Sequence, residues 1–351
     1  MDATEQTFDW TYSEDGIVQV RDTRYREDPS NVTSPVILEH KLTALKEGTA
    51  TVTGTPKDDT KGAKPVVFTV TVGKGDTVTF DYDKYVTQNI AHGNESIKKA
   101  LEGNYVYGAE WYIFTALRSG GNLSTADLED YYESVTDKLK NGSGRMQPTD
   151  YFLIAVTLEV MGKDPTDADG VNVIEKIYNF ENLDKYSSNQ IAFALLALDS
   201  KNYRIPENAK WSREDMIEAL LSFQKLSGDD EGGFGLGGSE TASVDITAMI
   251  LQALAPYNDE EHPKVAAAVT KALKYLQKEQ SADGGYWAEG YDNGCTAAQV
   301  LTALCALGID PLDEDNGFVK AGNIFATMSS DEFKKDKHYP KKNFFYGICL
   351  F

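Results

Sequence analysis

The sequence lacks any hydrophobic run that could cross a membrane, because no segment approaches the roughly 18 consecutive apolar residues that a bilayer requires. Basic charge is also scarce, with 34 lysines and arginines against 55 aspartates and glutamates and a net charge of −21. Nucleic-acid binding depends on basic residues that displace counterions from phosphates. We therefore expect no nucleic-acid partner, and we interpret the acidic charge as a solvated surface.

Cysteine is scarce as well. The three cysteines, Cys295, Cys305 and Cys349, lie close to the C-terminus. They are too few and too clustered for a disulfide framework, although one bridge is compatible with their number. Met1 is followed directly by Asp2, without a positive and apolar leader, so we expect no secretory signal in this sequence. A mature or recombinant fragment would have lost such a signal.

What is present is an ordinary globular composition of 351 residues, with 41% hydrophobic and 25% charged residues. The composition excludes a largely disordered chain, and the length corresponds to two domains at about 150 residues each. The hydrophobic period changes once along the chain. We therefore predict a first domain at 1–88 and a second at 89–351.

Residues of the first domain alternate between β-branched and polar types in four short segments. These segments are Gly16–Val20, Gly48–Thr53, Val66–Val72 and Thr77–Phe80. Turn residues such as proline, glycine and aspartate separate them. Several short strands joined by polar loops predict a small all-β sandwich.

Three blocks of this region resemble the bacterial immunoglobulin-like (Ig-like) domains of surface proteins. The blocks are Trp10–Val20, Leu42–Thr53 and Phe68–Val72. The resemblance implies an extracellular stalk or spacer rather than a catalytic unit. It also implies an extracellular or cell-surface location.

After Asn89 the period becomes about 3.6, which predicts helices. Five segments are apolar and rich in small residues: 109–117, 150–158, 189–198, 245–254 and 295–304. Amphipathic, charged segments lie between them, at 124–139, 171–180, 212–224 and 263–277. A ring of helical hairpins in two layers requires this alternation, because only the inner layer is covered on both sides. The pattern predicts an all-α (α/α) toroid of about five to six hairpins.

An internal repeat supports the hairpin interpretation. Gln224 matches Gln277, Gly232 matches Gly284, and an apolar helix ending in Ala-Leu follows each at a spacing of about fifty residues. Each glycine is followed by a second glycine, which lets the chain turn sharply between the two helices. The aromatic residue after each glycine pair is predicted to fill the seam between adjacent hairpins.

The segments Leu273–Gln277 and Asp283–Trp287 resemble the glutamine/tryptophan repeat of squalene and other terpene cyclases. Protein prenyltransferase β subunits share the same toroid. The resemblance covers roughly residues 95–328 and implies the toroid fold. These repeats are structural, so the resemblance implies much less about chemistry.

The segment Ser243–Ala248 resembles the Asp-x-Asp-Asp-Thr-Ala motif with which class II cyclases protonate an alkene. The resemblance implies that Asp245 is the general acid. Flanking carboxylates help such an acid to hold its proton, but the flanking positions here are Ser243 and Ile246. The alternative is an aspartate that caps the start of its own helix.

The segment Gly290–Cys295 resembles the zinc-binding stretch of prenyltransferase β subunits. The resemblance implies Asp292, Cys295 and a downstream histidine, His338, as ligands of a zinc ion with an open fourth position. Asp292 and Cys295 are one residue further apart than in the family. The alternative is a cysteine that packs as a small apolar residue, with no cofactor.

Aromatic and acidic residues occur where hairpin loops would surround one mouth of the toroid. The candidate ligand-binding residues are Trp111, Asp150, Tyr151, Phe234, Glu240, Tyr286, Trp287 and Tyr291. Together they would line a binding cavity. The alternative for each aromatic residue is packing in a seam or in the core.

These observations favour a secreted or cell-surface bacterial protein whose toroid binds a small-molecule, protein or glycan ligand without catalysis. The reason is that the scaffold is intact whereas each catalytic motif is incomplete. Two enzymatic alternatives remain open: a cyclase that uses Asp245 as its acid, and a zinc-dependent enzyme centred on Cys295.

Overall fold

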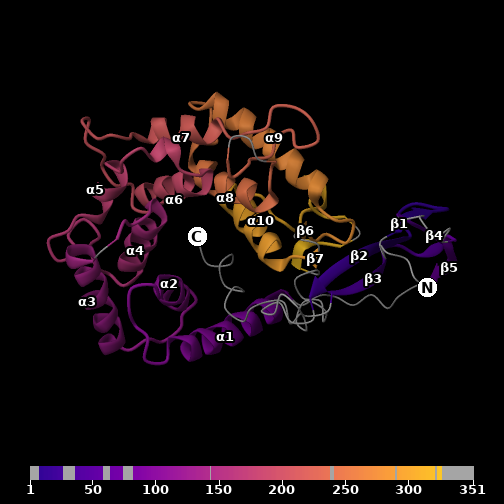
Figure 1. Cartoon of the computed structure of the whole chain (residues 1–351), viewed down its shortest axis with the longest axis horizontal. Helices are drawn as coiled ribbons and strands as arrows, with labels where there is room; N and C mark the ends of the chain where they lie inside the picture. The colour runs from indigo at the N-terminus through magenta and orange to yellow at the C-terminus, as the bar shows by residue number, and fades with distance from the viewer. Residues whose placement is uncertain are drawn as a thin grey trace. The chain divides into compact units, whose positions relative to one another are not determined.

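The computed structural model describes residues 8–26, 36–57, 64–73, 82–142, 144–237, 241–288, 291–320 and 322–325. In chain order, five strands come first and ten helices follow, with two short strands before the last helix (Figure 1). The chain divides into two compact units, of which one holds β1–β5 and the other holds α2–α8. The predicted order, an antiparallel sheet region followed by a helical region, is confirmed. None of the described helices is both long and apolar enough to span a membrane.

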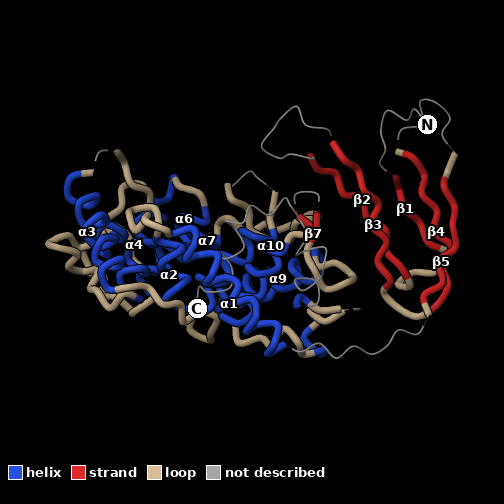
Figure 2. The backbone as a smooth tube through the Cα atoms, turned by 90° about the horizontal axis from the view of Figure 1, so that it is seen from below, coloured by secondary structure: helices blue, strands red, loops and turns tan. Residues whose placement is uncertain are grey.

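Two antiparallel sheets form the first region. Its strands are β1 (Phe8–Tyr12), β2 (Val18–Arg26), β3 (Val36–Ala44), β4 (Gly48–Pro56) and β5 (Val66–Val72). One sheet has the order β1-β4-β5, and β2 pairs with β3 (Figure 2). The predicted segments 48–53 and 66–72 fall within β4 and β5, the segment 16–20 reaches only the start of β2, and the fourth, 77–80, lies outside the described residues. Strands β1 and β3 were not separately predicted.

The alternation of residues along β4 explains the core of this region. Ala50 and Val52 are buried and pack with Ile17 and Val18, so the two sheets share one apolar core. Threonines alternate with the buried residues along β4 and lie on its more exposed face. At Gly54, a side chain would collide with the ring of Trp10, so the glycine makes room for the aromatic ring on the neighbouring strand.

The helices occupy the positions that the period predicted. Their bounds are α1 (Tyr82–Leu101), α2 (Glu110–Arg118), α3 (Thr125–Asn141), α4 (Pro148–Val160), α5 (Val173–Tyr178), α6 (Ser188–Asp199), α7 (Arg213–Leu221), α8 (Val244–Leu254), α9 (Pro263–Glu279) and α10 (Gly294–Ala306). The apolar segments correspond to the even-numbered helices α2 to α10, and the charged segments to α3, α5, α7 and α9. The predicted domain boundary after residue 88 falls inside α1, because the helix starts at Tyr82. The division at that boundary stays a prediction.

The apolar helices α2, α4, α6 and α8 pack side by side in a row, and α5 and α7 pack against it (Figure 1). Two hydrogen bonds give the direction of the helices in this row. At the start of α6, the Ser188 hydroxyl donates to the carbonyl of Gly235, in the loop before α8, at 2.8 Å. At the end of α6, the Ser200 hydroxyl donates to Glu159 of α4 at 2.8 Å. Helices α4, α6 and α8 therefore run parallel, and the row has an N-terminal end and a C-terminal end.

Glutamine side chains join consecutive hairpins at equivalent places. The Gln224 amide nitrogen donates to the carbonyls of Gly232 at 2.9 Å and of Ala268, in α9, at 2.8 Å. The Gln280 amide nitrogen donates in the same way to the carbonyls of Gly284 and Phe318, both at 2.9 Å. The partner of Gln224 in the repeat is thus Gln280.

The predicted match to Gln277 was wrong by three residues. Helix α9 extends to Glu279, so Gln277 still lies inside the helix, whereas Gln224 lies beyond the end of α7 at Leu221. Because α7 and α9 differ in length, the sequence spacing alone placed the glutamine too early.

The glycine pairs have the predicted role. Gly232 and Gly284 have φ angles of 91° and 90°, which L side chains rarely adopt. A side chain at Gly232 would also collide with the backbone of Lys271 in α9, and one at Gly284 would lie 2.5 Å from the backbone nitrogen of Asn323. Each glycine therefore permits a close approach to the segment of the chain that follows.

Candidate ligand-binding site

An open hollow of about 580 Å³ lies at the N-terminal end of the row. The ends of α3 and α5 and the start of α4 surround it. Its lining includes the basic residues Lys138, Arg145 and Lys176 and the aromatic residues Tyr151 and Phe180. This volume is within the range of roughly 300 to 1,000 Å³ that is typical of small-molecule sites.

Two aromatic rings, those of Tyr151 and Phe180, line this hollow, and the ring of Tyr186 contacts Phe180. Phe180 is in edge-to-face contact with Tyr186, at 5.3 Å between ring centroids, and with Tyr151, at 6.2 Å. The guanidinium of Arg145 lies 5.8 Å from the Phe180 centroid and 5.6 Å from the Tyr186 centroid. Both distances are within the range of cation-π attraction, so the rings hold the arginine head in place.

The charges around the hollow are only partly compensated. Within the described part of the chain, Arg145 and Lys176 make neither hydrogen bonds nor ion pairs through their side chains. Glu181 also lines the hollow, but its carboxylate is ion-paired with Lys210. Glu175 is the other acidic residue of the lining. The hollow thus presents unpaired basic groups in a chain that is strongly acidic.

A buried carboxyl group lies close to the hollow. Glu110, at the start of α2, is 4% exposed and accepts the backbone N–H of Gly108 at 3.0 and 2.9 Å on its two oxygens. The Tyr131 hydroxyl donates to the same carboxyl at 3.4 Å. Burial raises the pKa of Glu110, and the hydrogen bonds partly oppose that rise.

Tyr107 connects this carboxyl group to the hollow. The ammonium of Lys138, a lining residue, lies 5.2 Å from the centroid of the Tyr107 ring. Burial and the nearby carboxylates of Asp150 and Glu110 raise the Tyr107 pKa to about 12. Its hydroxyl therefore stays protonated at neutral pH and can donate a hydrogen bond.

The predicted ligand-binding residues divide into two groups. Tyr151 lines the hollow, and Asp150, beside it, accepts the backbone N–H of Gln147 at 2.7 Å and so caps the start of α4. Trp111 is half-buried, and its ring lies 6.3 Å from that of Phe152, between α2 and α4. The structure places Tyr151 and Asp150 together, with Trp111 in the adjoining aromatic cluster.

The other group is described only in part. Phe234 and Tyr286 are 0% exposed, so neither ring has surface to offer a ligand, and we retain the packing role for both. Trp287 is half-buried in the short strand β6 (Trp287–Ala288). Tyr291 belongs to β7 (Tyr291–Asp292), but its side chain is not described, and Glu240 lies outside the described residues.

The proposed acid, Asp245, is half-buried in the first turn of α8. A carboxylate there interacts favourably with the helix dipole, which fits the structural alternative equally well. Ser243, at the N-cap, makes no side-chain cap. The cyclase assignment stays a prediction.

The proposed zinc ligands are only partly described. Cys295 is half-buried at the start of α10, the side chain of Asp292 is not described, and His338 lies outside the described residues. Among the side chains that are described, no group of three or more histidine, cysteine, aspartate or glutamate residues could hold a metal. The zinc site stays a prediction.

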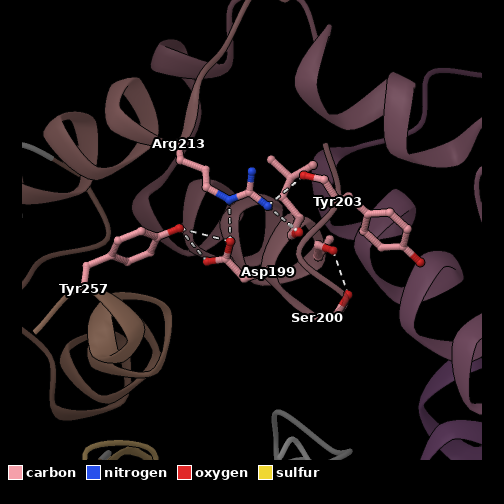
Figure 3. Close-up of polar contacts among 7 residues, drawn as sticks. Asp199, Ser200, Tyr203, Arg213 and Tyr257 are labelled. Carbon is pink, nitrogen blue, oxygen red and sulfur yellow. Dashed lines mark hydrogen bonds and ion pairs between the residues drawn. The ribbon is translucent and has the colours of Figure 1, made fainter. Parts of the chain in front are cut away.

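A second polar cluster lies at the C-terminal end of the row (Figure 3). Arg213 donates to Asp199 at 2.6 Å and to the carbonyls of Leu198 and Tyr203 at 2.7 and 2.9 Å. The Tyr257 hydroxyl donates to both oxygens of Asp199, at 3.0 and 2.9 Å. Every charge of this cluster has a partner within it, so its role is structural.

Sequence reasoning missed most residues of the candidate site, among them Glu110, Arg145 and Phe180. Two signals were available. Glu110 is an acid at the start of an apolar helix, and Arg145 is a basic residue that follows Gly144 in a loop between two helices. Phe180 carries no such signal, because an aromatic residue at the end of a helix is usually part of the core.

No protein-family model matches this sequence, and no curated protein is significantly similar to it. The functional argument therefore rests on the geometry of the chain itself.

Proposed function

We propose that the helical region is a non-catalytic ligand-binding module, and that its hairpins close into an α/α toroid. The observation that carries the proposal is the hollow at the N-terminal end of the row, where aromatic rings and unpaired basic groups meet. Polar groups at the C-terminal end of the same row are saturated. A site that binds a ligand needs groups that are still available to it, and this end has them.

Two features support the toroid. The side-by-side packing of α2, α4, α6 and α8, of which α4, α6 and α8 run parallel, provides the continuous inner layer that a ring of hairpins requires. The glutamine and glycine contacts recur in two successive hairpins, so the same geometry between neighbours is repeated. Small-angle X-ray scattering tests the closure, because a ring and an open solenoid give different distance distributions.

A non-catalytic role is supported by the incomplete catalytic motifs. The positions that flank Asp245 in the cyclase-like segment are Ser243 and Ile246, so the carboxylates that assist alkene protonation are missing. Location at the cell surface or outside the cell is part of the same proposal. It rests on the resemblance of the N-terminal strands to Ig-like domains.

A ligand screen tests the binding role. The full chain is titrated with a panel of glycans and small molecules, with protein-detected NMR or thermal shifts as the readout. We expect at least one ligand whose binding is lost in Tyr151→Ala and kept in Tyr132→Ala, a tyrosine on α3 that does not line the hollow.

Two results would overturn the proposal. One is a panel in which no ligand depends on Tyr151. The other is turnover of squalene or a prenyl diphosphate by the purified chain, with loss of product in Asp245→Asn. The second result would instead establish the cyclase alternative.

A further inference from the structure

The side chain of Arg145 lies close to aromatic rings but has no hydrogen-bond or ion-pair partner among the described residues. Its guanidinium lies over the rings of Phe180 and Tyr186, at 5.8 and 5.6 Å from their centroids. It makes no hydrogen bond or ion pair within the described residues. Cation-π attraction to these rings does not consume the N–H donors of the guanidinium. These donors match the two oxygens of a carboxylate.

The neighbouring charges favour one carboxylate over a polyanion. Lys176 supplies a second cation in the lining that makes no side-chain hydrogen bond or ion pair with described residues. Glu175, in the same lining, and the net charge of −21 oppose the approach of further negative groups. With Lys138 included, the lining holds three basic side chains against the carboxylates of Glu175 and Glu181, a small positive excess that suits a single negative group next to Arg145.

The remaining lining determines what the carboxylate is attached to. Most of the exposed surface of the hollow is polar, and Leu139, Met146 and Tyr151 contribute a smaller apolar part next to Arg145. A flexible methionine and an aromatic ring accommodate flat apolar groups of varied shape. The ligand therefore combines a charged end with an apolar or aromatic body.

We propose that this hollow binds a small ligand with one carboxylate on an apolar or aromatic group, and that Arg145 is the carboxylate-binding residue. This inference rests on the proposed ligand-binding function and adds the chemistry of the ligand to it. Converting the carboxylate of the ligand to a neutral amide should lower the affinity, because the guanidinium then lacks its charged partner.

Binding of four probes to the full chain tests the inference: 3-phenylpropanoate, its amide 3-phenylpropanamide, the cation 3-phenylpropylamine and glucuronate. We expect 3-phenylpropanoate to bind at least about 10-fold more tightly than the amide and the amine, because a charge-assisted hydrogen bond contributes that much. Glucuronate, which has the carboxylate without the apolar body, is expected to bind more weakly than 3-phenylpropanoate.

Variants identify the residue. Arg145→Gln is expected to weaken 3-phenylpropanoate binding about 10-fold or more, and Arg145→Lys several-fold, because lysine keeps the charge but loses the fork of donors. Arg204→Gln is the matched control, since Arg204 is also exposed and does not line the hollow. Its affinity is expected to equal that of the wild type, and melting curves show that each variant is folded.

The outcomes separate this inference from the proposed function. Equal binding of acid and amide, or unchanged affinity in Arg145→Gln, overturns the inference. If another ligand from the screen still depends on Tyr151 for binding, the proposed ligand-binding function stands although the inference about the carboxylate is lost. If no probe binds and no ligand in the screen depends on Tyr151, both are overturned.

Discussion

Two arginines lie at opposite ends of the row formed by α4, α6 and α8, and they differ in their partners. At the C-terminal end, the side chain of Arg213 is 18% exposed, is ion-paired with Asp199 and donates to two carbonyls. At the N-terminal end, Arg145 is exposed, and among the described residues its guanidinium interacts with the rings of Phe180 and Tyr186. The same residue type thus has a saturated environment at one end and an unsaturated one at the other.

The difference separates a structural role from a binding role. Arg213 donates to the carbonyl of Leu198, in the last turn of α6, and to that of Tyr203, in the loop that follows, and its charge balances the carboxylate of Asp199. Arg145 satisfies nothing within the described residues, so its removal leaves no group without a partner. Stability should therefore depend on the first arginine, and ligand binding on the second.

The largest expected effect comes from removing the saturated arginine. Arg213→Ala leaves the carboxylate of Asp199, which is 16% exposed, without its cation and removes a hydrogen bond from two carbonyls, of which that of Leu198 keeps the backbone N–H of Tyr203 as a partner. We expect a loss of about 3 kcal/mol in the free energy of unfolding, measured by urea denaturation. Arg145→Ala, at the other end, should cost less than about 1 kcal/mol. Equal losses at both ends would remove the basis of the comparison.

Close packing of loops, rather than ion pairing, should stabilise the N-terminal end. Gly232, in the loop before α8, has φ 91° and lies against the backbone of Lys271. We expect Gly232→Ala to destabilise the fold by about 2 to 3 kcal/mol, because the backbone strain and the collision add.

The control for this variant lies in the same loop. Gly228 has φ 84° but has nothing within 4 Å of the position of a side chain. Gly228→Ala should therefore cost only the strain, about 1 to 2 kcal/mol. A Gly232→Ala variant as stable as Gly228→Ala would show that the contact with Lys271 is not tight in solution.

A smaller effect is expected from single hydroxyl groups. Tyr257→Phe removes the hydrogen bonds to both oxygens of Asp199 but leaves the ion pair with Arg213 intact. The loss should be about 1.5 kcal/mol. Tyr151→Phe should change stability by less than about 0.5 kcal/mol, since its hydroxyl makes no hydrogen bond within the described residues. Chemical denaturation of the two variants in parallel measures the difference.

The smallest effect is a pair of pH dependences of opposite sign. Burial raises the pKa of Glu110, so the folded state binds the proton more tightly than the unfolded state. Stability is then greatest below the unfolded pKa and decreases as pH rises through the folded pKa. Glu110→Gln should therefore gain in stability relative to the wild type as pH rises above about 4.3, the ordinary glutamate pKa.

Asp215, which caps the start of α7, should show the opposite dependence of stability on pH. Hydrogen bonds from Ser212 lower the pKa of Asp215, so its contribution is present above the unfolded pKa and is lost as pH falls through the folded pKa. Denaturation curves of Glu110→Gln and Asp215→Asn across the acidic range measure both slopes. Slopes of the same sign would contradict the assignment of these two carboxyl groups.

The candidate site was only partly predictable. Tyr151 and Asp150 follow from the expectation that loops before apolar helices surround a mouth. The same expectation selected Phe234 and Tyr286, which are completely buried. An aromatic residue after a glycine pair has the same local sequence whether it packs in a seam or faces a ligand. Its burial depends on the neighbouring hairpin, which is distant in the sequence.

By itself, the sequence determined the type and position of most elements, because helix and strand periods and glycine breaks act within a few neighbouring residues. Tertiary structure decided which glutamine is equivalent to Gln224, since a hydrogen bond to Phe318 depends on where α9 ends. Tertiary structure also decided which arginine has hydrogen-bond and ion-pair partners for its guanidinium. The partners of Arg213 and the rings beneath Arg145 come from other segments of the chain, and only packing brings them together.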